Sequence, residues 1–150
     1  MRISSQIPLL VLCLAACNGT PTTGPRTLTY AAVANVVTQI PTKVQLNGTI
    51  RNDGLQSLTI HTGACSVGYR LYSYAQVQGS ASPVYEFNPT GQLCIAIAYQ
   101  KTLAPGEEYA MNSGPLTLSG LVTPGPYELR VTMYHDGVVG EASAGQIDIR

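Results

Sequence analysis

Apolar and polar residues alternate along most of this chain, and this period of two constrains the fold more than any other feature. Residues 43–51 and 127–134 show it most clearly, because apolar or glycine residues take every second position in both stretches. Successive side chains of a β-strand point to opposite faces, so the alternation predicts strands with one buried face. No window shows a convincing helical stripe. The chain is therefore predicted to be all-β.

Turn signals divide the alternation into short strands. Asn52-Asp53-Gly54 ends the first clear stretch, and Asp136-Gly137 is a strong hairpin signal. Further strands are expected at residues 30–37, 58–60, 67–72, 84–87, 93–99, 108–111, 116–118 and 146–149. The most apolar of these, 93–99, is predicted to be an inner strand buried on both faces. Several short strands separated by turns favour an immunoglobulin-like antiparallel β-sandwich.

The N-terminus carries a short apolar segment that ends in a cysteine. Met1-Arg2 supplies a positive charge, residues 7–14 are the apolar part, and Leu14-Ala15-Ala16-Cys17 completes the segment. This pattern resembles the lipobox of bacterial lipoproteins. The resemblance implies that signal peptidase II cuts before Cys17 and that the Cys17 sulfur carries a diacylglyceryl group.

Two other interpretations of this segment stay open. An uncleaved transmembrane helix needs about 20 apolar residues, and the segment is shorter than that. An ordinary secretory signal peptide cut at another position would leave Cys17 as a free thiol.

These predictions divide the chain into three parts. They are a signal peptide at residues 1–16, the lipidated cysteine with its tether at 17–26, and one immunoglobulin-like domain at 27–150. The domain is expected on the outer side of a bacterial membrane, anchored in the cell envelope by the lipid on Cys17. Asn18 follows the cysteine, which resembles lipoproteins sent to the outer membrane in bacteria that have one.

Cysteine number and charge agree with an exported protein. Cys13 would be removed with the signal peptide, which leaves Cys65 and Cys94 as an even pair that an oxidising compartment is expected to join. A reactive-thiol or metal site is the weaker alternative, because a structural zinc ion needs four ligands. The formal net charge is zero and the Lys and Arg residues are scattered, so no basic patch for nucleic acid is predicted.

Enzymatic activity and cofactors are not expected. The sequence has no nucleophile elbow, zinc-protease helix or phosphate-binding glycine loop. It has two histidines, and His135 directly precedes the Asp136-Gly137 turn, where a solvated loop histidine is expected. No metal ligands are assigned.

Four segments together resemble the BsuPI-type intracellular proteinase inhibitor family. They are Arg51-Asn52-Asp53-Gly54 after a strand, Pro83-Val84-Tyr85-Glu86, Leu103-Ala104-Pro105-Gly106-Glu107, and Pro124-Gly125-Pro126-Tyr127-Glu128-Leu129 before a long strand. The resemblance implies an immunoglobulin-like sandwich and, as one possible function, inhibition of a proteinase by a rigid loop. The candidate loops are residues 75–83 and 112–123.

The sequence also suggests a contact surface. If Tyr69 faces the core, Arg70, Tyr72 and Tyr74 project from the opposite face and form a candidate binding patch. The alternative is that these tyrosines cover the second side of a sheet. The leading hypothesis is a lipid-anchored, non-catalytic module that binds or scaffolds an envelope partner, and the alternative is a surface-tethered proteinase inhibitor.

Overall fold

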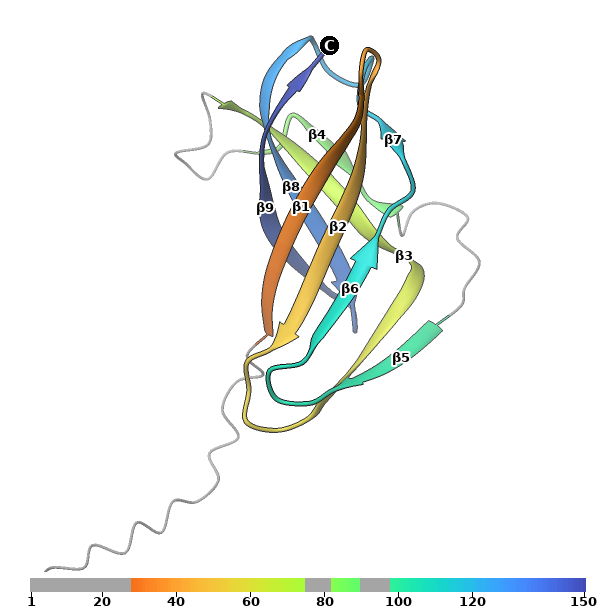
Figure 1. Cartoon of the computed structure of the whole chain (residues 1–150), viewed down its shortest axis with the longest axis vertical. Helices are drawn as coiled ribbons and strands as arrows, with labels where there is room; N and C mark the ends of the chain where they lie inside the picture. Colours follow the sequence, from red (N-terminus) through yellow and green to blue (C-terminus); the bar gives the residue numbers. More distant parts are fainter. Residues whose placement is uncertain (1–27, 75–81, 90–97) are drawn as a thin grey trace, which may run out of the picture.

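A computed structural model describes residues 28–74, 82–89 and 98–150 of the chain. The regular elements in these residues are β-strands, which pack as an immunoglobulin-like antiparallel sandwich (Figure 1). The strands are β1 (Leu28–Gln39), β2 (Thr42–Asn52), β3 (Leu58–Ser73), β4 (Tyr85–Phe87), β5 (Ala98–Leu103), β6 (Glu108–Asn112), β7 (Leu116–Thr117), β8 (Gly125–His135) and β9 (Val138–Ile149). The predicted all-β fold is confirmed.

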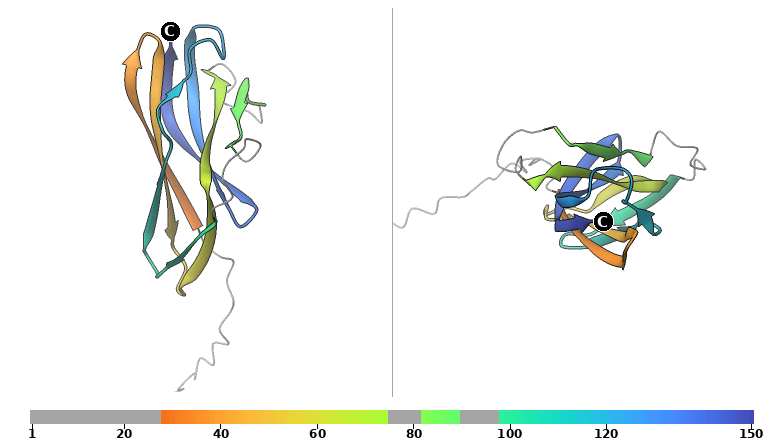
Figure 2. Two further views of the ribbon diagram at one scale, coloured as in Figure 1. Left: turned by 90° about the vertical axis from the view of Figure 1, so that its right-hand side faces the viewer. Right: turned by 90° about the horizontal axis from the view of Figure 1, so that it is seen from above.

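The strands form two sheets, which lie as separate layers in Figure 2. Sheet A has the order β1-β2-β6, and β7 also pairs with β2. Sheet B has the order β4-β3-β8-β9, and β5 also pairs with β3. Since β2 and β3 each pair with at least three other strands, these two strands organise the sandwich.

The predicted alternation is confirmed in both long stretches. In β2 the side chains of Val44, Leu46 and Ile50 are fully buried, whereas their neighbours face outward. In β8 the inward residues Tyr127, Leu129, Val131 and Met133 belong to the same core. The hydrophobic core therefore lies between the sheets, where the period of two places it.

Local turn chemistry also follows the sequence. Asp136 and Gly137 have φ angles of 47° and 73°, as the two central residues of a type I′ hairpin turn require, and the turn joins β8 to β9. Tyr127 buries its ring, and its hydroxyl donates a hydrogen bond of 2.8 Å to the carbonyl of Thr123. This is the geometry of a tyrosine corner.

One predicted strand has a different environment. Residues 93–97 lie outside the described part of the chain, while Ala98 and Tyr99 begin β5, and both are exposed. The prediction of an inner strand buried on both faces is therefore wrong for these two residues. The physical reason is that β5 pairs with β3 alone among the described strands, so it is an edge strand with an open side.

β3 changes its inward side part-way along its length. Ile60 and Thr62 face the core in the first half, and Val67, Tyr69 and Leu71 do so in the second half. The pairing with β8 shifts between Thr62 and Val67, which marks a β-bulge. Across this bulge, Ser66 Oγ accepts a hydrogen bond of 2.7 Å from the Gly63 amide. The bulge turns the second half of β3 so that its apolar residues still reach the core.

Asn52 holds together one end of the sandwich. Its side chain is 2% exposed, and its amide nitrogen donates to the carbonyls of Gln56 at 2.8 Å and Leu103 at 3.0 Å. Its backbone N–H donates to the Glu107 carbonyl at 3.0 Å, and its carbonyl accepts from Gly106 at 2.7 Å. Two of the segments that carry the family resemblance therefore meet here as structural partners.

Replacing Asn52 tests this role. The Asn52→Asp variant keeps the shape of the side chain but removes both donors and aims a carboxylate at two carbonyl oxygens. We expect it to lower the free energy of unfolding by at least about 2 kcal/mol, measured by urea denaturation. The control Asn47→Asp lies on the half-exposed outer side of β2 and should change stability by less than about 0.5 kcal/mol. Equal effects of the two variants would contradict this account.

Candidate functional site

The predicted binding patch lies on the outer face of sheet B, where charged residues hold each other. Arg70 contacts Glu86 at 2.9 Å and Glu141 at 2.6 Å. Burial opposes the charge of Arg70, but the hydrogen bonds to Glu141 and Glu86 outweigh it and raise the pKa of Arg70. Arg70 is thus committed to ion pairs within the sheet.

Tyr72 is also covered on this face. The guanidinium of Arg130 lies 4.6 Å from the centre of the Tyr72 ring, and Tyr72 is only 8% exposed. Arg130 itself is held by Glu128 at 2.7 Å and Glu141 at 3.2 Å. Tyr72 thus lies on the face opposite Tyr69, where a cation and its ion pairs cover its ring, and its part in binding stays a prediction. Tyr74 is 59% exposed and lies just beyond the end of β3.

The predicted cysteine sites are only partly described. Cys65 lies in the bulge of β3 and is disulfide-bonded. Cys94 and Cys17 lie outside the described residues, so the pairing of Cys65 with Cys94 and the lipidation of Cys17 stay predictions. Among the described residues, no group of three or more His, Cys, Asp or Glu side chains is arranged to hold a metal ion. The same residues include no helix that is long and apolar enough to cross a membrane.

His135 is buried and bonded, so the prediction of a solvated loop histidine is wrong. It is 5% exposed, it stacks on Tyr30, and its Nε2 lies 2.9 Å from the Tyr30 hydroxyl. Its Nδ1 lies 3.5 Å from Asp136, whose other carboxylate oxygen lies 2.8 Å from His61 Nδ1. This Tyr30-His135-Asp136-His61 cluster ties β1 and β3 to the β8–β9 turn.

The electrostatics of the cluster favour a structural role. Burial raises the pKa of Tyr30, so its hydroxyl stays protonated and is a poor nucleophile. Burial also opposes the charge of Asp136, but the hydrogen bonds from His61 and His135 outweigh it and lower the Asp136 pKa. The cluster therefore holds a carboxylate charge at a turn instead of activating a hydroxyl.

A cleft lies at the edge of the sandwich where β5 and β6 separate. The two strands share the turn at residues 104–107 and then diverge, β5 with sheet B and β6 with sheet A (Figure 1). The cleft has a volume of about 370 Å³, within the range of small-ligand pockets. It is lined by Gly63, Ala64, Ser66, Val67, Tyr99, Tyr109, Ala110, Met111 and Asn112.

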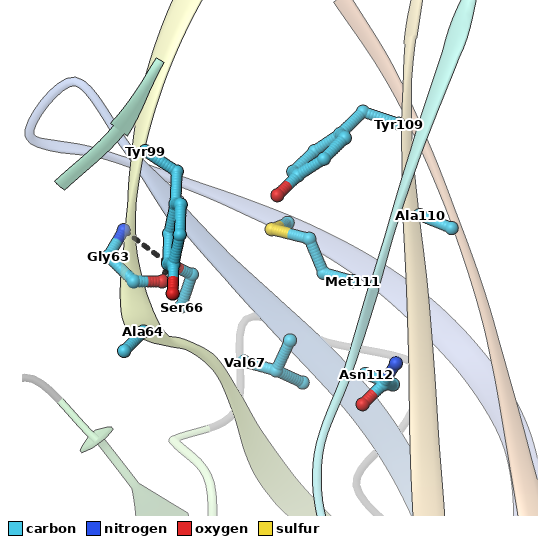
Figure 3. A pocket seen from close by; sticks show the side chains of 9 residues that line it. All are labelled: Gly63, Ala64, Ser66, Val67, Tyr99, Tyr109, Ala110, Met111 and Asn112. Carbon is cyan, nitrogen blue, oxygen red and sulfur yellow. Dashed lines mark hydrogen bonds between the residues drawn. The ribbon is translucent and has the colours of Figure 1, made fainter. Parts of the chain in front are cut away.

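The walls of the cleft differ in chemistry from the outer face of sheet B. Figure 3 shows Tyr99 and Tyr109 on opposite sides, with Met111 between them. Met111 and Val67, each 7% exposed, form an apolar floor. None of the described residues that line the cleft is charged. The cleft therefore fits an uncharged part of a ligand. Sequence reasoning missed it, because the out-of-phase alternation at Ile60 and Val67 looks like two separate strands and hides the bulge that shapes one wall.

The loop at residues 112–123 does not stand out from the sandwich. Ser113 donates its N–H to the Leu46 carbonyl at 2.9 Å, β7 pairs with the start of β2, and Leu118 is fully buried. Of the other candidate loop, residues 75–81 lie outside the described part. Proteinase inhibition stays a prediction.

Comparison with known proteins adds little to this geometry. No protein-family model matches the chain, and no curated protein matches it in sequence. Among solved structures, the chain is similar to Bacteroides uniformis β-glucuronidase 2 covalently bound to cyclophellitol-6-carboxylate aziridine, with 16% identity and a TM-score of 0.36. The likeness covers 81% of this chain and 13% of the glucuronidase chain. At this TM-score it supports no conclusion about this chain.

The lowered pKa of Asp136 predicts how the cluster responds to pH. Because the carboxylate is favoured in the folded state, its contribution to stability is present above the ordinary value of 3.8 and is lost as pH falls through the lower folded pKa. The Asp136→Asn variant should be less stable than the wild type at neutral pH, since asparagine keeps the positive φ but not the charge. Urea denaturation across a pH series should show this difference shrinking in acid. A difference that stays constant below pH 3.8 would contradict the assignment.

Proposed function

We propose that this chain is a lipid-anchored protein of the bacterial cell envelope whose β-sandwich binds a partner there and catalyses no reaction. The anchor rests on the lipobox-like sequence that ends at Cys17. Two or three acyl chains would hold such a protein stably, because one chain alone binds a membrane only marginally. The sandwich would then lie within the length of a short tether from the membrane surface.

The open cleft between β5 and β6 carries the binding part of the proposal. It is concave, uncharged and aromatic, which is the character of sites that bury part of a ligand. Tyrosine adds contact area at a low cost in conformational entropy, and Tyr99 is 48% exposed at the rim. In contrast, ion pairs occupy the arginines on the outer face of sheet B.

The absence of catalysis is proposed from what the reactive side chains do. His61 and His135 are the two histidines of the sequence, and both hold Asp136 at the β8–β9 turn. The hydroxyl within hydrogen-bond distance of His135 Nε2 belongs to Tyr30, whose pKa is raised by burial. These groups stabilise the fold, which leaves the cleft as the candidate for recognition.

The test is photo-crosslinking in the bacterium that encodes the chain. A benzoylphenylalanine residue replaces Tyr99 in the full-length protein, and the matched control carries it in place of the exposed Tyr74. We expect the Tyr99 position to give one discrete adduct with an exported protein in the membrane fraction, and the Tyr74 position to lack that adduct. In the same cells, Cys17→Ser should abolish labelling by palmitate and release the chain from membranes, whereas Cys13→Ser should keep both properties.

Two results would contradict the proposal separately. Identical adducts from both positions, or none from position 99, would reject the cleft as a recognition site. Retention of the palmitate label and of membrane association by Cys17→Ser would reject the anchor.

A further inference from the structure

The outer edge of β6 presents to the cleft backbone groups that no other described strand pairs with. β6 pairs antiparallel with β2, and Ser113 donates its N–H to Leu46 O at 2.9 Å while Asn52 donates to Glu107 O at 3.0 Å. Hydrogen-bonded pairs in an antiparallel ladder occur at every second residue. Met111 and Tyr109 therefore bond to β2, and the N–H and C=O groups of Ala110 and Asn112 point away from it.

The cleft lies on the side to which these groups point. Ala110 and Asn112 both line the cleft, and both are exposed residues of β6. Among the described strands, β6 pairs with β2 alone, and β5 pairs with β3 alone. The described strands thus leave this edge of β6 unpaired beside the cleft.

An edge of this kind is a template for another strand. Residues two apart on a strand are about 6.8 Å from each other, so the groups of Ala110 and Asn112 match the repeat of an extended polypeptide. Natural sheets protect exposed edges with proline or lysine, and β6 contains neither residue. Its sequence is Glu-Tyr-Ala-Met-Asn, with the inward Tyr109 and Met111 facing the cleft.

We infer that the partner of the cleft is an extended segment of another protein, which adds to β6 as a new edge strand of sheet A. Its backbone would bond to Ala110 and Asn112, and every second side chain would enter the cleft between Tyr99 and Met111. Since the described lining is uncharged, those inward side chains are uncharged as well, whereas the alternate ones face solvent. A polysaccharide lacks the repeated N–H and C=O groups that match a strand edge. This inference rests on the proposed function and names the class of its partner.

The Ala110→Pro substitution tests the outer edge of β6 without removing a hydrogen bond to β2. Proline is tolerated on an edge strand where the N–H faces outward, because no ladder hydrogen bond is lost. Ala110→Pro removes one outward donor and places a ring on the edge. Gly114→Pro is the control: it introduces the same ring beyond the end of β6, at a residue with open space around its Cβ position.

The probe is a phage-displayed library of linear dodecapeptides, selected on the full chain held in detergent micelles. We expect enriched peptides in which every second residue is uncharged, a loss of affinity of about tenfold or more with Ala110→Pro, and unchanged affinity with Gly114→Pro. Tyr99→Ala, which leaves the β6 edge intact, should weaken the same peptides by a smaller factor. This variant keeps the test decisive if thermal unfolding shows that Ala110→Pro is damaged.

Three outcomes would overturn the inference. They are no enriched peptide, equal binding to the wild type and to a folded Ala110→Pro variant, and a wild-type dimer in sedimentation that Ala110→Pro dissociates. The last result would make a second copy of this chain the occupant of the edge. Since the assay uses purified protein, its outcome does not depend on the anchor or on crosslinking in cells, so failure of this inference can be distinguished from failure of the proposed function.

Discussion

The hydrogen bonds of Asn52 determine how the two sheets are joined and where they separate. This buried residue ends β2 in sheet A, and its side chain bonds to the carbonyl of Leu103 at the end of β5 in sheet B. Its backbone bonds to Gly106 and Glu107, which lead into β6. The β5–β6 turn is thus fixed at one point, and the strands diverge from it toward different sheets. The cleft is a consequence of that divergence.

The two surfaces that could bind a partner are built from opposite chemistry. On sheet B, Arg70 and Arg130 share Glu141, and Arg130 covers the ring of Tyr72, so this face satisfies its own charges. At the β6 edge, the described lining is uncharged and backbone groups face outward. A partner that binds to sheet B must break existing ion pairs, which costs free energy. Unpaired backbone groups instead gain hydrogen bonds when a partner binds. The physical contrast favours the edge for recognition.

Much of the fold could be predicted because alternation fixes which residues of β2 and β8 face the core. The hairpin at Asp136-Gly137 and the corner at Tyr127 also follow from local chemistry. The sequence could not show that Ile60 and Val67 belong to one bulged strand, because their alternation is out of phase and looks like two strands. It could not show that Tyr99 lies at an edge, since apolar composition does not report the number of neighbouring strands. The burial of His135 depends on Tyr30, more than a hundred residues away in sequence, and no local pattern encodes that contact.

The most direct test of this account is hydrogen exchange at single amides of β6, followed by NMR on the free protein. The pairing of β6 with β2 predicts that the amides of Tyr109 and Met111 are protected and that those of Ala110 and Asn112 exchange at least about tenfold faster. Slow exchange at all four positions would contradict the central claim, because it would mean that the outer edge of β6 is already paired.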